Sequence, residues 1–342
     1  MLARPRASAA VADVVRHLIG LQAQIPSATS LAVRVRTVGL TEADAERAMV
    51  PAGTLVRTWL MRGTLHVIHV DDFAWLLPLL GPPMIRKGAR RRHQLGLDAV
   101  TLSRSVDVLG GLLAAGPMTR PNVFAGLARK GIDPAGQRGI HIVQHAALRG
   151  LLCFGPDRGR DQTWMLRPAG AGPSLDRDNA LAEFARRYRI GYGHCEPSDL
   201  ASWSGLSVTD ARAAWRLSEG ADSADLDPPL PTGAPTVRLL PHFDPYLLGY
   251  ADRSLAVPDE HRPRVWTGGG YVLPTVVANG RVLGTWTATR RSRRLEVSAT
   301  PFGHTWDDPV RAGLETEFED IGRFSALELR PVTAPPGLAS PR

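Results

Sequence analysis

The chain has 342 residues, of which 44% are hydrophobic, so it can bury a sizeable core in one large domain or in two to three smaller ones. Its formal net charge of +8 and isoelectric point near 10.2 favour an acidic partner, most often nucleic acid. The two cysteines, Cys153 and Cys195, lie far apart, which argues against a disulfide scaffold and a cysteine-rich zinc site.

The composition also argues against metal, membrane and Schiff-base chemistry. The ten histidines form no HExxH motif and no other metal-ligand spacing, so we expect no metal and no other cofactor. No apolar run approaches about 18 residues and the amino terminus lacks a signal-peptide core, which predicts a cytoplasmic protein without membrane contact. Only Lys87 and Lys130 could supply a side-chain amine for a Schiff base.

The first predicted unit spans residues 8–85. An apolar-periodic helix leads to the segment Leu21 to Pro26, and further helices are predicted over 31–38 and 41–49. Two β-rich runs then form a hairpin about Arg62-Gly63. Three helices followed by a hairpin is the order of a winged-helix domain.

Two glutamines, Gln22 and Gln24, lie at the turn between the first two helices. Residues two apart point about 200° apart on a helix but to the same side of an extended segment, and Pro26 favours the extended form at Ile25. Each amide carries an acceptor oxygen and two donor hydrogens, so the pair could hold a water together with a phosphate or sugar. Alternatively, both glutamines satisfy backbone groups at a tight turn.

Two further units are predicted after a basic run at residues 86–93, which is either a solvated linker or a phosphate-contacting segment. The second unit, residues 101–168, repeats the order of three helices and a hairpin, with arginines at the hairpin tip. The third unit, residues 176–235, contains three helices and ends in a loop at 221–235.

The region from 236 to 332 is expected to be β-rich. Asn279-Gly280 between two apolar runs is a strong hairpin signal, and an arginine-rich turn follows at 290–294. An amphipathic helix is predicted over 308–324, and the residues from about 335 are expected to be disordered. The predicted fold class is therefore α+β, with tandem winged-helix units followed by a β-rich C-terminal region.

The chain resembles a known family in three stretches that together span most of its length: GLQAQ at 20–24, LVRTWLMRGTLH at 55–66 and LLPHFDPYLLGYADR at 239–253. It is similar to the winged-helix DNA-binding family that contains the AlkZ-type and YcaQ-type DNA glycosylases. Gln22 and Gln24 match the glutamine-apolar-glutamine motif of the AlkZ type, whereas YcaQ-type members tend to carry an aspartate at the second position.

The resemblance implies a concave basic surface that binds duplex DNA carrying alkylated purines. It implies a monofunctional glycosylase that hydrolyses the N-glycosidic bond of bulky or cationic N7- or N3-alkylpurines. Some members of the family also unhook interstrand crosslinks. Gln22 and Gln24 would be catalytic, one holding the water and the other the sugar-phosphate. We expect a monomer that serves DNA repair or resistance to one genotoxin.

The DNA contacts are expected from basic side chains on the first hairpin, the basic run, the second hairpin tip and the arginine-rich turn. They are Arg57, Arg62, His66, Arg86, Arg90, Arg91, Arg92, Arg158, Arg160, Arg290, Arg291, Arg293 and Arg294. His66 could instead pack within its strand. Asp244, which precedes Pro245, could cap a turn or take part in catalysis.

A second class of function is left open by the residues alone. A non-catalytic winged-helix transcription regulator would read bases with a helix of the second unit. The reading residues would be Gln137, Arg138, His141, Gln144 and His145. A third hypothesis is a resistance protein that binds a genotoxic natural product directly.

Overall fold

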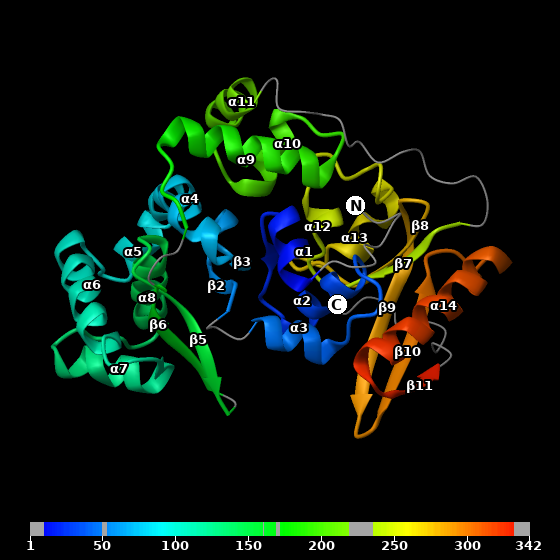
Figure 1. Cartoon of the computed structure of the whole chain (residues 1–342), viewed down its shortest axis with the longest axis horizontal. Coiled ribbons are helices and arrows are strands. Elements are labelled where there is room, and N and C mark those ends of the chain that lie inside the picture. The colour runs from blue at the N-terminus through cyan, green and yellow to red at the C-terminus, as the bar shows by residue number, and fades with distance from the viewer. Residues whose placement is uncertain (1–9, 50–52, 160, 169–171, 219–234, 332–342) are drawn as a thin grey trace.

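The computed structural model describes residues 10–49, 53–159, 161–168, 172–218 and 235–331 (Figure 1). Within these ranges the chain combines α-helices with three β-sheets, which confirms a mixed helix-and-sheet fold. Predictions that concern Arg160, residues 221–234 and the tail from about 335 lie outside the described residues.

The N-terminal elements place a short strand beside a hairpin. They are α1 (Val11–His17), β1 (Leu21–Gln22), α2 (Pro26–Arg34), α3 (Glu42–Met49), β2 (Leu55–Trp59), the 3-10 turn η1 (Met61–Gly63) and β3 (Leu65–His69). The strands pair in the order β1-β3-β2 and run antiparallel, so Gln22 lies opposite His66. Val11, Val14 and Val15 of α1 are buried, as their helical spacing predicts.

A long helix follows, although the sequence predicts only a short one, capped by Asp71-Asp72 and running through Trp75 and Leu79. The turn η2 (Val70–Asp72) leads into α4 (Phe73–Lys87), which continues through Pro78, Pro82 and Pro83. A proline inside a helix costs about 3 kcal/mol or more. The apolar side chains that α4 buries in the core offset this cost.

The basic run at residues 86–93 is helical rather than a linker, because it covers the end of α4 and then α5 (Ala89–Gln94). The order of helices and hairpin predicted for the second unit is observed. Its elements are α6 (Ala99–Leu113), β4 (Met118–Thr119), α7 (Arg120–Arg129), α8 (Arg138–Leu148), β5 (Leu152–Arg158) and β6 (Asp161–Leu166). A Cβ on Gly81 of α4 would lie 2.2 Å from the carbonyl oxygen of Leu148, so α4 and α8 are in direct contact.

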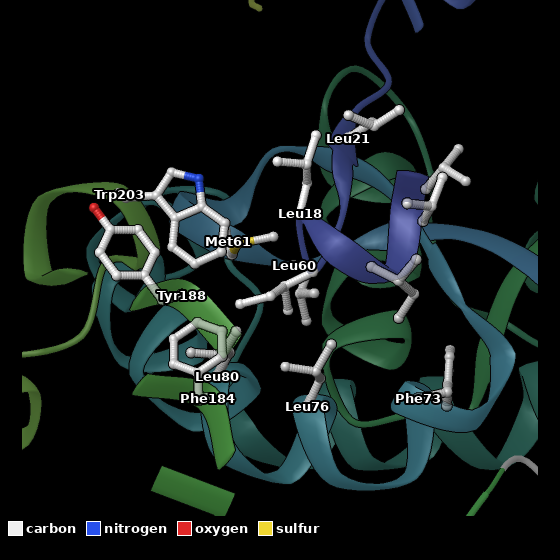
Figure 2. Packing of buried hydrophobic residues seen from close by; sticks show 14 of the residues in the cluster. Leu18, Leu21, Leu60, Met61, Phe73, Leu76, Leu80, Phe184, Tyr188 and Trp203 are labelled. Carbon is white, nitrogen blue, oxygen red and sulfur yellow. The ribbon is translucent and has the colours of Figure 1, made fainter. Parts of the chain in front are cut away.

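Three more helices complete the predicted third unit: α9 (Arg177–Tyr192), α10 (Pro197–Ser204) and α11 (Val208–Leu217). They share a core with the N-terminal elements. Leu60 and Met61 belong to the same buried cluster as Phe184, Tyr188 and Trp203 (Figure 2). The first and third predicted units are therefore packed together, and their division into separate domains stays a prediction.

The C-terminal region is a five-stranded sheet with a helix packed on it. Its elements are β7 (Val237–Leu240), α12 (Pro245–Leu248), η3 (Asp259–His261), α13 (Arg262–Val265), β8 (Thr275–Ala278), β9 (Arg281–Arg291), β10 (Arg294–Pro301), α14 (Asp308–Ser325) and β11 (Glu328–Pro331). The strand order is β11-β10-β9-β8-β7, and only β10 and β11 of these described strands pair in parallel. In Figure 1 the β5–β6 and β9–β10 hairpins extend toward the same edge of the view, on either side of α3.

Buried ion pairs attach α2 to this C-terminal region. Arg34, at the end of α2, donates to Glu317 at 2.8 Å and to Asp320 at 2.7 Å, both on α14. Arg36 donates to both carboxylate oxygens of Asp244, at 2.7 and 2.9 Å. Because α2 begins two residues after Gln24, these pairs hold the helix that carries the glutamine turn.

Candidate active site

The glutamine turn is extended, as its spacing predicts. Gln22 ends β1, and the next backbone N–H, that of Ala23, donates to the carbonyl of Leu65 at 2.8 Å. The Thr29 hydroxyl donates to the carbonyl oxygen of Gln22 at 3.2 Å, which closes the turn onto α2. Ala23 is buried and Gln24 is exposed, so the turn presents the polar residues on the side opposite the apolar one.

The two amides meet on one side of this turn. The Nε2 of Gln22 donates to the Oε1 of Gln24, and Gln22 is half-buried. Amides paired in this way are neutral, and they offer donors and acceptors to a substrate without taking up a proton. The pair is therefore suited to holding a water or an oxygen of the sugar-phosphate, and not to general acid chemistry.

Arg62 lies against the glutamine pair, although the sequence suggests a DNA contact. One guanidinium nitrogen donates to Gln22 Oε1 at 3.1 Å, and the other donates to the carbonyl oxygen of Trp203. The sequence places Arg62 in a stretch that resembles the family, but no local pattern indicates a partner on α10. Sequence reasoning misses this interaction because Trp203 is 141 residues away in the chain.

His66 packs within its strand, so the predicted DNA contact is wrong and the alternative is confirmed. The side chain is 2% exposed, and its Nδ1 lies 3.1 Å from the carbonyl oxygen of Thr64. Burial, and next the nearby positive charge of Arg62, lower the pKa of His66 to about 3. The imidazole is therefore neutral at ordinary pH and supplies no positive charge to DNA.

Arg57 and Arg92 are also directed into the protein. Arg92 is 5% exposed and donates to the carbonyl oxygen of Ile85, which contradicts the predicted phosphate contact. Arg57 is half-buried, and its guanidinium lies over the ring of Phe154 at 4.5 Å from the centroid. Arg92 therefore packs within the protein, whereas a DNA contact of the half-buried Arg57 stays a prediction.

The remaining predicted contacts lie at the surface. They are Arg86, Arg90, Arg91, Arg158, Arg290, Arg291, Arg293 and Arg294. At the β9–β10 tip, Arg290 pairs with Glu42 at 2.5 Å and Arg294 with Glu328 at 3.0 Å. Exposed pairs of this kind are worth about 1 kcal/mol or less, so a phosphate can replace the carboxylate.

The base-reading residues of the regulator hypothesis are engaged within the protein. Gln144 donates to the carbonyl oxygen of Gly63 at 3.2 Å, and Gln137 accepts from Arg91 at 2.7 Å. Arg138 donates to the carbonyl oxygens of Leu95 and Asp133.

The two histidines of this set are buried or half-buried. His145 is 7% exposed, and burial lowers its pKa to about 4. Burial also lowers the pKa of the half-buried His141. In the free protein these side chains already have partners or are buried, and a base-reading role for the helix stays a hypothesis.

Asp244 caps a turn, as one of its two predicted roles requires. Its Oδ1 accepts from the backbone N–H of Tyr246 at 2.9 Å, at the start of α12. The carboxylate is fully buried and neutralised by Arg36. A catalytic role for this carboxylate is therefore contradicted.

Two features are absent from the part of the chain that the structure describes. Three or more histidine, cysteine, aspartate or glutamate residues do not come together there in a metal-binding arrangement. Among the described helices, none combines the length and the apolar character needed to cross a bilayer.

Comparison with known proteins assigns the class. The family model described as "DNA glycosylase AlkZ-like" matches residues 15–324. The chain therefore belongs to the AlkZ-like DNA glycosylase family and is an enzyme of the DNA glycosylase class.

A relative and a solved structure agree with this assignment. A Streptomyces sahachiroi protein named as an interstrand DNA cross-link repair glycosylase is 28% identical over 363 residues, covering 96% of this chain and 94% of the relative. The structure of Streptomyces sahachiroi DNA glycosylase AlkZ has the same fold, with a TM-score of 0.74 and 24% identity. That alignment covers 97% of this chain and 96% of the other.

Proposed function

We propose that the chain is a monofunctional glycosylase that hydrolyses the N-glycosidic bond of N7- or N3-alkylated purines in duplex DNA, with Gln22 and Gln24 as its catalytic residues. The meeting of the two amides on one side of an extended turn carries this proposal. In the same proposal the helix-and-hairpin units are winged helices. The protein acts as a monomer in the cytoplasm, in DNA repair or in resistance to one genotoxin.

The chemistry of such a lesion fits a pair of neutral amides. An N7-alkylguanine is already cationic, so its base leaves without protonation by the enzyme. The transition state is oxocarbenium-like, as in glycoside hydrolysis, and what remains is to place a water and to stabilise the sugar cation. Positioned hydrogen-bonding groups lower the barrier for both tasks without a change in their own charge.

Bulky lesions are included in the proposed substrate range. The relative from Streptomyces sahachiroi is named for interstrand cross-link repair, and it matches nearly the whole of this chain. A crosslink cannot leave the duplex as a single flipped base, so it must be approached in the groove. We therefore propose N7-linked crosslinks as substrates alongside monoadducts.

The experiment that tests this function is base release from duplex DNA containing one N7-methylguanine or one bulkier N7 adduct. We expect the free alkylated base as product, with strand cleavage only after alkali, because a hydrolase leaves an intact abasic strand. Release of no base from either duplex, despite tight binding, would contradict the proposal. Strand cleavage without alkali would contradict its monofunctional part.

The exposed arginines at the β9–β10 tip are the proposed phosphate-binding residues of the C-terminal region. The double substitution Arg291→Ala with Arg293→Ala should weaken binding to damaged and undamaged duplexes by similar factors. The slope of log K against log salt should fall by about one for each phosphate that the variant no longer neutralises. Arg311→Ala on α14 is the matched control, and an equal effect from it would contradict phosphate binding localised at the tip.

A further inference from the structure

We propose that Arg62 is the positioning residue that sets which way the Gln22 amide points, and that α10 holds Arg62 in place. The inference rests on the proposed function, because it assigns a task to each glutamine. Its consequence is that Gln22 accepts from the attacking water and Gln24 donates to the sugar-phosphate.

The orientation follows from hydrogen-bond chemistry. A guanidinium has donors and no acceptor, so the Gln22 atom that lies 3.1 Å from Arg62 has to be the carbonyl oxygen. The amino group of Gln22 then faces Gln24, whose carbonyl oxygen accepts from it. Gln24 is exposed, and its amino group takes no part in these two hydrogen bonds, so it can face a ligand.

The roles of the two glutamines follow from this orientation. The Oε1 of Gln22 accepts one bond from Arg62 and keeps a second lone pair that can accept a hydrogen bond from the attacking water, without taking up its proton. The amino group of Gln24 can only donate, so it suits the oxygen acceptors of a phosphodiester or a deoxyribose. Without Arg62 both amides could rotate by 180°, and the donors and acceptors of the pair would exchange places.

The backbone around Arg62 is built to hold this side chain. Arg62 has a φ of 56°, in the left-handed region that non-glycine residues rarely adopt, and Gly63 follows with a φ of 77°. Gln144 of α8 donates to the carbonyl of Gly63, so a second helical unit fixes the turn. Strained backbone that the surroundings hold in place is frequent at functional sites.

The second anchor is the C-terminal end of α10. Its carbonyl groups carry the negative end of the helix dipole, which favours a bound guanidinium at Trp203. Gly205, with a φ of 83°, ends α10 in the left-handed conformation and lies next to the backbone of Arg62. A Cβ there would lie 3.4 Å from the N and Cα of Arg62. Met61, the neighbour of Arg62, and Trp203 belong to the same buried cluster (Figure 2).

The test is single-turnover base release from the N7-methylguanine duplex at saturating enzyme, together with the Kd for the same duplex. Arg62→Ala should lower the rate by about 10- to 100-fold, the loss expected for one charge-assisted hydrogen bond, and leave the Kd unchanged. Arg62→Lys is the second variant, and it provides the test if Arg62→Ala does not fold. It should also be slow, because a single ammonium cannot replace the planar fork that reaches both partners.

Two comparisons separate positioning from a general structural role. Millimolar guanidinium should restore part of the rate to Arg62→Ala and none to Gln22→Ala. Arg104→Ala is the matched control, since Arg104 also donates to a carbonyl at a helix end, that of Lys130, and it should keep the wild-type rate.

The outcomes also separate this inference from the proposed function. A wild-type rate in folded Arg62→Ala or Arg62→Lys would overturn the inference, as would a loss of affinity with an unchanged saturated rate. Either result alongside a slow Gln22→Ala would leave the proposed function standing. A wild-type rate in both Gln22→Ala and Gln24→Ala would contradict the proposed function itself.

Discussion

Gln22→Ala and Gln24→Ala should each lower the single-turnover rate of alkylpurine release by about 100-fold or more, with nearly unchanged affinity for undamaged duplex. Removing one preorganised hydrogen-bonding group from an active site typically costs a factor of this size. Affinity for undamaged duplex should persist because the exposed arginines are the proposed source of most phosphate contacts, whereas the amide pair contributes a single contact at the lesion. The measurement is the saturated rate, combined with a binding titration for each variant.

The substitution Gln24→Glu sharpens this prediction. A carboxylate has nearly the shape of the amide but can only accept hydrogen bonds when ionised. If Gln24 donates to the sugar-phosphate, the glutamate variant should be at least as slow as the alanine variant. Gln162→Ala, an exposed glutamine on β6, is the control and should keep the wild-type saturated rate. Full activity of Gln22→Ala together with Gln24→Ala would contradict a site built on this turn.

The largest effect on stability is expected from Arg36→Ala. The substitution leaves the carboxylate of Asp244 buried without its partner, and breaking such a pair costs about 3–5 kcal/mol. The free energy of unfolding from urea titration, with far-UV circular dichroism as the probe, measures this loss directly.

The exposed pair of Arg47 and Asp44 provides the matched control for this prediction. The side chain of Arg47 is 70% exposed, so Arg47→Ala should cost about 1 kcal/mol or less. A loss of under about 1 kcal/mol for Arg36→Ala would show that the buried pair does not hold α2 to the C-terminal region.

Local patterns in the sequence account for the glutamine turn and for the order of elements. The two-residue spacing of Gln22 and Gln24, with Pro26 behind them, predicts an extended segment, and the strand pairing of β1 confirms it. Glycine and proline stop signals mark the ends of the helices before the hairpin β5–β6. Both depend on interactions between residues close in the chain, which a sequence displays directly.

The errors arise where distant packing decides the outcome. The length of α4 is not predictable locally because prolines normally end a helix, and only burial of its apolar side sustains it. Within the basic run, Arg92 is buried whereas Arg90 and Arg91 are exposed, since a helical segment has an inward face that a linker lacks. The partners of Arg62 could not be predicted, because no periodicity links Gln22 with Trp203.

The central claim is that a pair of neutral amides releases bases that are already cationic. The most direct measurement compares release of N7-methylguanine with release of a neutral modified base, hypoxanthine, from duplexes of the same sequence, under single-turnover conditions. The account predicts rapid release of the cationic base and no detectable release of the neutral one, because neither Gln22 nor Gln24 can protonate a leaving group. Equal release of both bases would contradict it.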